Sequence, residues 1–216
     1  ALESHRRALA ARERGDWDAE IVPVDLPADG DRPAVRLAAD ECPRADTSAD
    51  RLAALPPVFA DDGSVTAGNS SAMADGAAAL VLTTRSRARE LGREPLFALV
   101  SFAQGAVPGA EMWRGPTLSL PRALERAGLA LGDLDLVEVN EAFAVQMLAA
   151  ERTLGWDRER VNPNGGAIAL GHPTGVSGAR ILVTLGHALA RRDRELGGAA
   201  ICGGGGVTTA CVIRRG

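Results

Sequence analysis

The distribution of apolar and polar positions predicts five helices. They cover residues 1–14, 84–92, 118–127, 140–153 and 175–191. Three of these ranges end at or just before a glycine, at positions 15, 92 and 128, and glycine is a common helix terminator. The last helix has the clearest apolar face, which is formed by Ile181, Leu182, Leu185 and Leu189.

Short apolar runs predict strands at residues 21–24, 76–82, 96–102, 133–140, 198–202 and 207–213. The alanine-rich run 76–82 is typical of a fully buried strand. With the helix and strand that follow, it predicts a right-handed crossover unit. Run 133–140 alternates polar and apolar residues. The last two runs predict a hairpin-like pair, whereas residues 25–62 contain several prolines and are predicted to be mostly irregular. This mixture of elements indicates the α/β class.

Composition narrows the range of functions. The 216 residues are 46% hydrophobic and 24% charged, as in ordinary globular proteins, and the net charge of −4 gives no reason to expect nucleic acid as a partner. No apolar run is long enough to cross a bilayer, so we expect no membrane contact. The first residues also lack the hydrophobic segment of a signal peptide. Three cysteines without framework spacing favour a reducing compartment, so we expect a cytoplasmic protein, and none of them forms a metal-ligand pair.

Residues 162–180 form a loop rich in glycine and proline that holds one histidine just before the last predicted helix. Pro173 restricts His172 to extended backbone geometry, and the glycines permit close approach by other groups. Such a loop is either a tight turn that leads into a helix or a support for an imidazole at the mouth of a site.

Two further positions carry candidate chemistry. Cys202 ends an apolar run and is followed by four glycines, which can aim a backbone N–H into a site. A lone cysteine at a strand end is, however, often a small buried hydrophobic residue. Asn140 lies at a strand-to-helix junction, where asparagine is also a good helix N-cap. Both interpretations stay open at each position.

Taken together, three motifs resemble a known family. Asn-Glu-Ala-Phe-Ala begins at Asn140, Asn-Gly-Gly-Ala-Ile-Ala-Leu-Gly-His-Pro surrounds His172, and Cys-Gly-Gly-Gly begins at Cys202. In this order and at these spacings they resemble the C-terminal half of thiolases, the group of acetyl-CoA acetyltransferase and 3-ketoacyl-CoA thiolase. The resemblance extends upstream through residues 65–69 and 75–79 and covers nearly the whole chain.

The resemblance implies a thiolase-like fold of layered αβαβα type. Residues 96–216 would form a C-terminal mixed-sheet domain with helices on both faces. Residues 1–75 would be the remnant of a loop domain that contacts coenzyme A, and residues 76–95 would be the last strand and helix of an N-terminal domain. The chain looks like a family member without its N-terminal half. We therefore expect it to associate with that half, with a partner subunit or with further copies of itself.

The resemblance also implies a reaction, the reversible Claisen condensation of acyl-CoA thioesters through an acyl-cysteine intermediate. His172 and Asn140, which would hold a water, would form one oxyanion hole, and the Gly204 N–H would contribute to a second. Cys202 would be the acid/base. Its reference pKa of roughly 8.5 would need only a modest shift to work near neutrality. Acyl-CoA would be a substrate, with no tightly bound cofactor.

Five residues are expected to contact this substrate. Ser71 matches a serine at the pantetheine, Arg44 and Arg51 fall near the nucleotide end, Met112 matches a loop that lines the acyl pocket, and Phe143 belongs to the Asn140 motif. Both arginines also suit a solvated surface, and the spacing of Phe143 with Met147 and Leu148 is equally typical of a helix core.

Three positions depart from the family pattern. Ala72, Ala74 and Trp113 replace residues that are usual in the family, and Trp113 would either reshape the acyl pocket or cap the core. Cys42 does not match the motif of the nucleophile, so no nucleophile is assigned. The alternatives are an inactive fragment or a noncatalytic acyl-CoA-binding module. A Rossmann-type nucleotide site is weaker because its glycine motif lacks the required context.

Overall fold

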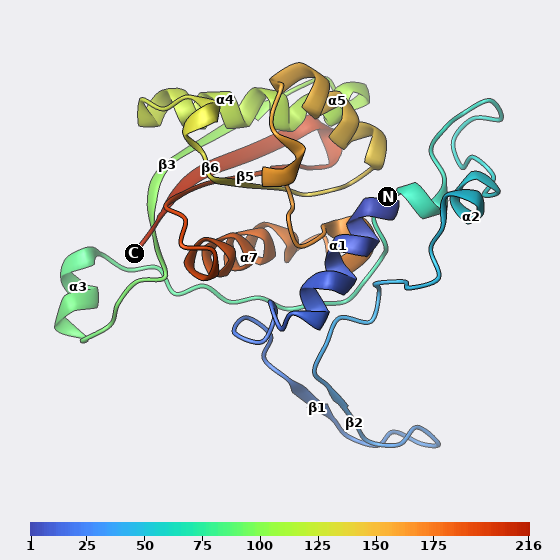
Figure 1. Ribbon diagram of the computed structural model, residues 1–216, viewed down its shortest axis with the longest axis horizontal. Coiled ribbons are helices and arrows are strands. Elements are labelled where there is room, and N and C mark those ends of the chain that lie inside the picture. The colour runs from blue at the N-terminus through green and yellow to red at the C-terminus, as the bar shows by residue number, and fades with distance from the viewer.

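The computed structural model describes all residues 1–216 and is built around one four-stranded sheet (Figure 1). The strands are β3 (Phe97–Ala106), β4 (Leu136–Val139), β5 (Leu196–Cys202) and β6 (Val207–Arg215). Their spatial order is β3-β6-β5-β4. β4 and β5 are parallel, with Val139 opposite Ala200, whereas β6 runs antiparallel to both β5 and β3. The predicted mixed sheet and the hairpin-like final pair are confirmed.

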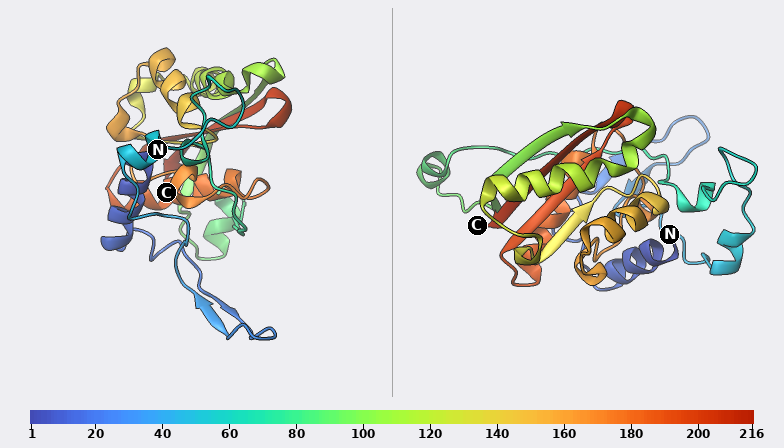
Figure 2. Two further views of the ribbon diagram at one scale, coloured as in Figure 1. Left: turned by 90° about the vertical axis from the view of Figure 1, so that its right-hand side faces the viewer. Right: turned by 90° about the horizontal axis from the view of Figure 1, so that it is seen from above.

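Helices cover both faces of the sheet (Figures 1 and 2). α4 (Gly115–Ala127) and α5 (Ala144–Leu154) lie on one face, and α7 (Ser177–Arg191) lies on the other. α1 (Leu2–Glu13) packs beside α7 against the short helix α6 (Ala167–Leu170), which the sequence pattern did not predict. The α/β layering is confirmed.

The apolar faces of these helices build two core clusters. Leu120 and Leu124 of α4 pack with Val139 and Val212 on one side of the sheet. On the other side, Leu185 and Leu189 of α7 pack with other residues of the same strands. α4 ends at Gly128 and α5 at Gly155, both in the left-handed conformation that favours glycine as a terminator.

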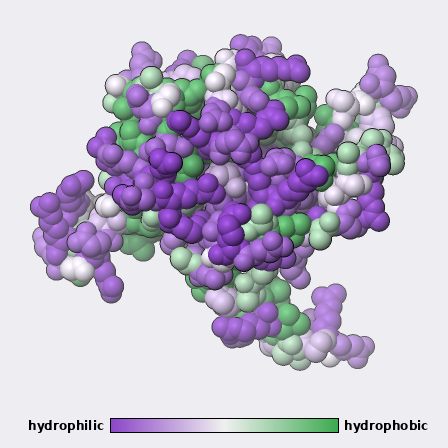
Figure 3. Space-filling model, viewed as in Figure 1, coloured by the Kyte–Doolittle hydropathy of each residue, from purple (hydrophilic) through white to green (hydrophobic).

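A two-stranded hairpin and two short helices extend from this body. β1 (Val24–Leu26) and β2 (Val35–Leu37) form a two-stranded antiparallel hairpin, which projects at the bottom of Figure 1 and shows apolar residues in Figure 3. α2 (Ala49–Ala53) and α3 (Arg85–Glu90) lie at opposite sides of the same view.

The bounds of one predicted strand are wrong. The strand at 21–24 begins only at Val24, because Val24 is the first residue that β2 pairs with. Residues 25–62 are mostly irregular, as predicted, and contain only the short hairpin strands and α2. The strand predicted at 133–140 forms as β4, and although its sequence alternates polar and apolar residues, all four of its residues are buried.

The predicted buried strand at 76–82 is also wrong, and with it the crossover unit. These residues adopt no regular structure, form no backbone hydrogen bond and are mostly exposed. A strand needs a neighbour to satisfy its N–H and C=O groups, and no strand of this chain lies alongside.

Candidate active site

The carboxyl ends of β4 and β5 bring two of the predicted residues to one edge of the sheet. The Asn140 N–H donates to the Ala200 carbonyl at 3.0 Å, which extends the parallel pairing by one residue. Asn140 is completely buried, and Cys202, the last residue of β5, is 4% exposed. Asn140 does not cap α5, because the N-cap of that helix is Phe143.

Asn140 and His172 are in direct contact. Asn140 Nδ2 lies 3.3 Å from His172 Nε2. On the other side of the ring, Ser177 Oγ lies 2.6 Å from Nδ1 and 3.2 Å from the carbonyl oxygen of Pro173. A hydroxyl has one hydrogen, so Ser177 can donate either to Nδ1 or to the Pro173 carbonyl. If it donates to Nδ1, the proton of the neutral ring is on Nε2; if it donates to Pro173, Nδ1 can carry the proton and donate to Ser177 Oγ. The predicted carboxamide and imidazole therefore meet, although Ser177 was not predicted.

The segment around Ala72 joins the two motif loops. The His172 N–H donates to the Ala72 carbonyl at 2.8 Å, and the Ala72 N–H donates to Ala167 at 3.4 Å. One residue earlier, the Ser71 N–H donates to the carbonyl of Ala142 at 2.9 Å. Ser71 therefore lies beside the turn that follows Asn140.

Gly171 allows this close approach. Its φ of +93° is in the region that favours glycine, and a Cβ there would lie 2.5 Å from the Ala74 Cβ and 3.4 Å from Cys42 Sγ. Cys42 therefore lies next to the histidine loop. Burial raises the pKa of the Cys42 thiol, and the charges of Asp40 and Glu41 add to this effect. A protonated thiol suits a nucleophile poorly, which agrees with leaving Cys42 unassigned.

A buried carboxylate fixes the geometry behind the site. Glu141 accepts hydrogen bonds from Ser4 Oγ at 2.7 Å, from Asn162 Nδ2 at 3.1 Å and from the Ile168 N–H at 3.2 Å. Asn162 also exchanges two 2.8 Å bonds with the backbone of Val139, at the end of β4. Sequence reasoning missed this network; the available signal was that Glu141 and Asn162 both lie within the motif regions around Asn140 and His172.

Cys202 lies in a tightly packed environment. A Cβ at Gly115 would be 3.0 Å from both the Cys202 Cβ and the Thr208 side chain. Thr208 Oγ1 in turn donates to the Ile201 carbonyl at 3.0 Å. Burial raises the pKa of the Cys202 thiol, the main opposing influence being a backbone hydrogen bond. Burial thus acts against the modest downward shift of the pKa that acid/base work near neutrality would need, and the role of Cys202 stays a prediction.

His172 is also shifted toward its neutral form. Burial lowers the pKa of the imidazole, and the positive charge of Arg180 lowers it further. Arg180 Nη1 lies 3.7 Å from Oε2 of Glu138, two residues before Asn140. Burial raises the pKa of Glu138 to about 8, although Arg180 opposes the shift. A neutral imidazole can donate one hydrogen bond without carrying charge.

Gly204 lies in an exposed turn at the end of β5. The turn is anchored at Gly206, which has a φ of +88° and accepts a hydrogen bond from the Val107 N–H at 2.9 Å. A Cβ at Gly206 would lie 2.0 Å from the Val107 carbonyl oxygen, so only glycine fits. Gly204 itself has open space around it.

The other predicted substrate contacts are spread over two regions. Met112 is half-buried in the short 3-10 helix Gly109–Arg114, which packs against α5 and the glycine turn. The Phe143 ring meets Phe59 edge-to-face, with centroids 6.1 Å apart. Trp113 is 39% exposed and does not cap the core.

Arg44 and Arg51 are exposed on the surface. The Arg44 backbone N–H donates to His5 Nδ1 at 3.2 Å, and Arg44 itself is exposed to solvent. The Arg51 side chain pairs with Asp46 and is 65% exposed. Their assignment to a nucleotide end stays a prediction.

No helix of the structure combines the length and apolar composition needed to cross a membrane.

Family sequence models and individual relatives of known function point to the same family. Residues 93–215 match the sequence model described as the thiolase C-terminal domain, and residues 1–86 match the thiolase N-terminal domain. The chain is 52% identical over 215 residues to the acetyl-CoA acetyltransferase of Escherichia coli K12, covering 100% of this chain and 54% of that protein.

Two solved structures extend the comparison. The Bacillus anthracis acetyl-CoA acetyltransferase superposes with a TM-score of 0.95 at 46% identity, covering 99% of this chain and 54% of the other. Human mitochondrial 3-ketoacyl-CoA thiolase in complex with CoA gives a TM-score of 0.91 at 38% identity, covering 100% and 53%. The chain thus spans about half the length of the relatives it matches. It belongs to the thiolase family.

Proposed function

We propose that this chain supplies the acid/base and oxyanion-binding half of a thiolase-type acyltransferase. The reaction is the reversible condensation and thiolysis of acyl-CoA thioesters, as the names of its relatives suggest. Acyl-CoA is the proposed substrate, and no tightly bound cofactor is required. Support comes from family membership and from the arrangement of Asn140, His172 and Cys202 at one edge of the sheet.

The contact between Asn140 and His172 is the observation that carries the proposal. If Ser177 donates to Nδ1, the proton of the neutral imidazole is on Nε2, which then faces the Asn140 Nδ2 donor at 3.3 Å. Two donors cannot satisfy each other. An oxygen that accepts from both, such as the enolate oxygen of a thioester or a water held by Asn140, satisfies them together. This is the requirement of an oxyanion hole.

Cys202 completes the proposed chemistry. In thiolysis its protonated thiol gives a proton to the enolate carbon of the leaving acetyl-CoA, and in condensation the thiolate takes that proton back. The raised pKa of the thiol favours the acid form at rest. The Gly204 N–H would stabilise the oxyanion of the acyl-enzyme step.

The nucleophilic cysteine is proposed to come from a complementary thiolase half or a partner subunit. We retain the division into 1–75, 76–95 and 96–216 as part of this proposal, with Ser71, Phe143 and Met112 near the acyl-pantetheine arm and Arg44 and Arg51 near the nucleotide. A cytoplasmic location agrees with three free cysteines.

Co-expression with the N-terminal half of a relative tests the function. We expect cleavage of acetoacetyl-CoA by the pair, and a loss of at least about a hundredfold on Cys202→Ala. Cys211→Ala removes a half-buried thiol that packs beside α7 and is the matched control, with activity expected to persist.

The alternative is a noncatalytic acyl-CoA-binding module, which the departures at Ala72, Ala74 and Trp113 favour. Coenzyme A binding without turnover in any pairing would support the module and would overturn the enzyme proposal.

A further inference from the structure

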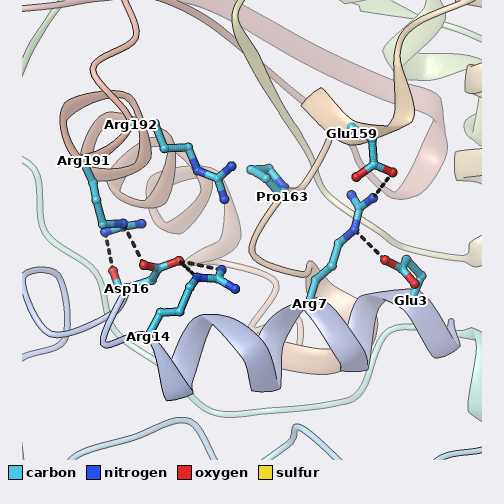
Figure 4. A pocket seen from close by; sticks show the side chains of 8 residues that line it. All are labelled: Glu3, Arg7, Arg14, Asp16, Glu159, Pro163, Arg191 and Arg192. Carbon is cyan, nitrogen blue, oxygen red and sulfur yellow. Dashed lines mark hydrogen bonds and ion pairs between the residues drawn. The ribbon is translucent and has the colours of Figure 1, made fainter.

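A polar cavity of about 450 Å³ lies between α1 and the C-terminal end of α7 (Figure 4). Apart from Pro163, every residue that lines it is charged. α7 has 15 residues and is therefore about 22 Å long, so the cavity and His172 lie at opposite ends of this helix. Hydrophilic residues also gather over α1 in the space-filling view (Figure 3). The cavity has no wall that would suit an acyl chain.

At one end of the cavity, the charged side chains pair with one another. Arg7 Nε donates to Glu3 and Arg7 Nη2 donates to Glu159, each at 3.0 Å. Arg7 Nη1 also donates to the Val161 carbonyl at 2.7 Å. With two carboxylates for one guanidinium, this end carries net negative charge and does not attract an anion.

The opposite end has the reverse balance. Asp16 is buried and accepts hydrogen bonds from Arg14 at 2.8 and 3.1 Å, while Arg191 Nε lies 3.0 Å from its other oxygen. Arg192 has no carboxylate partner; its Nη2 donates only to the amide oxygen of Asn164, at 3.0 Å. Three guanidinium groups therefore share one carboxylate, which leaves an excess of two positive charges.

Figure 4 shows that this excess charge faces the cavity. The Arg192 guanidinium points inward, above Arg14, and no dashed line joins it to a carboxylate. Burial lowers the pKa of Arg192, and the positive charges of Arg14, Arg191 and Arg7 lower it further, while Asp16 acts in the opposite direction. A negatively charged ligand would offset the repulsion between these guanidinium groups.

We propose that the end of the cavity formed by Arg14, Arg191 and Arg192 binds a small dianionic oxyanion of the phosphate class. Two charges match the local excess, and the planar fork of donors on arginine matches the oxygens of phosphate. The cavity is open and larger than the ion itself, so the phosphate can be free or part of a small phosphomonoester. The site is independent of the acyltransferase chemistry.

Isothermal titration of this chain with inorganic phosphate tests the proposal. At low ionic strength and about pH 8, where phosphate is mainly the dianion, we expect saturable binding to one site. Arg192→Gln should weaken this binding by about tenfold or more. Arg89→Gln removes the same charge from an exposed arginine of α3 that forms no ion pair, and it should bind as the parent does.

A second variant protects the test against misfolding. Arg14 is half-exposed, so Arg14→Gln should fold normally and should also weaken phosphate binding. Ethyl phosphate in place of inorganic phosphate distinguishes an ester from the free ion: tighter binding of the ester would show that its organic part also contacts the cavity. Absence of saturable binding for both probes would overturn the proposal, as would an equal loss in Arg89→Gln.

Discussion

At the residue scale, the groups behind the site are held away from their usual charge states by burial. Glu138 is completely enclosed beneath Asn140, and both of its oxygens lack a hydrogen-bond partner. The nearest counter-charge is Arg180, at 3.7 Å. Burial therefore outweighs the ion pair, and the pKa of Glu138 rises to about 8. The folded state is therefore less stable when the buried carboxyl of Glu138 loses its proton.

This predicts a pH-dependent effect of Glu138→Gln. The folded pKa of about 8 lies above the usual value of 4.5, so the folded state holds a proton that the unfolded state releases. Stability should fall as pH rises from 4.5 through about 8. Glutamine has no proton to lose, so the variant should match the parent near pH 5 and exceed its Tm by a few degrees near pH 9.

Thermal unfolding of both proteins across this pH range checks the expectation. Glu125→Gln is the control, because Glu125 is exposed on α4 and its replacement should leave the pH profile unchanged. The three histidines are common to all variants, and the charge of Glu20, which itself raises the pKa of Glu138, acts in the same direction in the parent. If the two Tm curves for Glu138→Gln and the parent run parallel, the proposed protonation is wrong.

At the element scale, the loop from 162 to 171 depends on glycines that admit neighbouring groups. A Cβ at Gly166 would lie 2.3 Å from the Glu141 Cδ, and Glu141 cannot move aside, because Ser4, Asn162 and the Ile168 N–H hold it. Gly166→Ala should destabilise the chain by about 1 to 3 kcal/mol through overpacking.

Urea unfolding measures this effect through the midpoint of the transition. Gly132→Ala is the matched control, since a Cβ there meets nothing within 4 Å and the φ of Gly132 is not positive. Its midpoint should stay level or rise slightly. Equal midpoints for the two variants would show that Glu141 can move aside to make room for the added Cβ, against this prediction.

These elements also show what the sequence can predict. Four long helices, the shorter α3 and four of the strands follow from local periodicity and glycine punctuation, which act over a few residues. The motifs identified Asn140 and His172, whose contact the structure shows. Asn162 and Glu141 were missed because their roles depend on partners distant in sequence. Ser177 was missed although its partner His172 is only five residues away, because its contact depends on how the loop folds back on itself. The prediction for 76–82 failed for a related reason: its apolar composition suits a strand, but pairing requires a neighbour.

At the scale of the whole molecule, the segment 76–82 places large apolar side chains at the surface. Val81 is 94% exposed and Leu82 is 80% exposed. Nearby, the edge strand β3 exposes Leu99 and Phe102 and pairs only with β6. Unpaired strand-forming residues and an open sheet edge are typical places for association with another chain. The chain spans about half the length of its relatives, so a complementary half is the partner we propose.

We therefore predict that the chain self-associates when alone and forms a one-to-one complex when the N-terminal half of a relative is added. Burial of Val81 and Leu82 would drive both, because each apolar side chain contributes about 1.5 to 3 kcal/mol when removed from water. Sedimentation velocity over a range of concentrations measures this. The double variant Val81→Asp and Leu82→Asp should be largely monomeric, whereas Val22→Asp, at a position 82% exposed near the hairpin, should behave as the parent does. A parent chain that stays monomeric at every concentration and ignores the added half would refute the role of this segment.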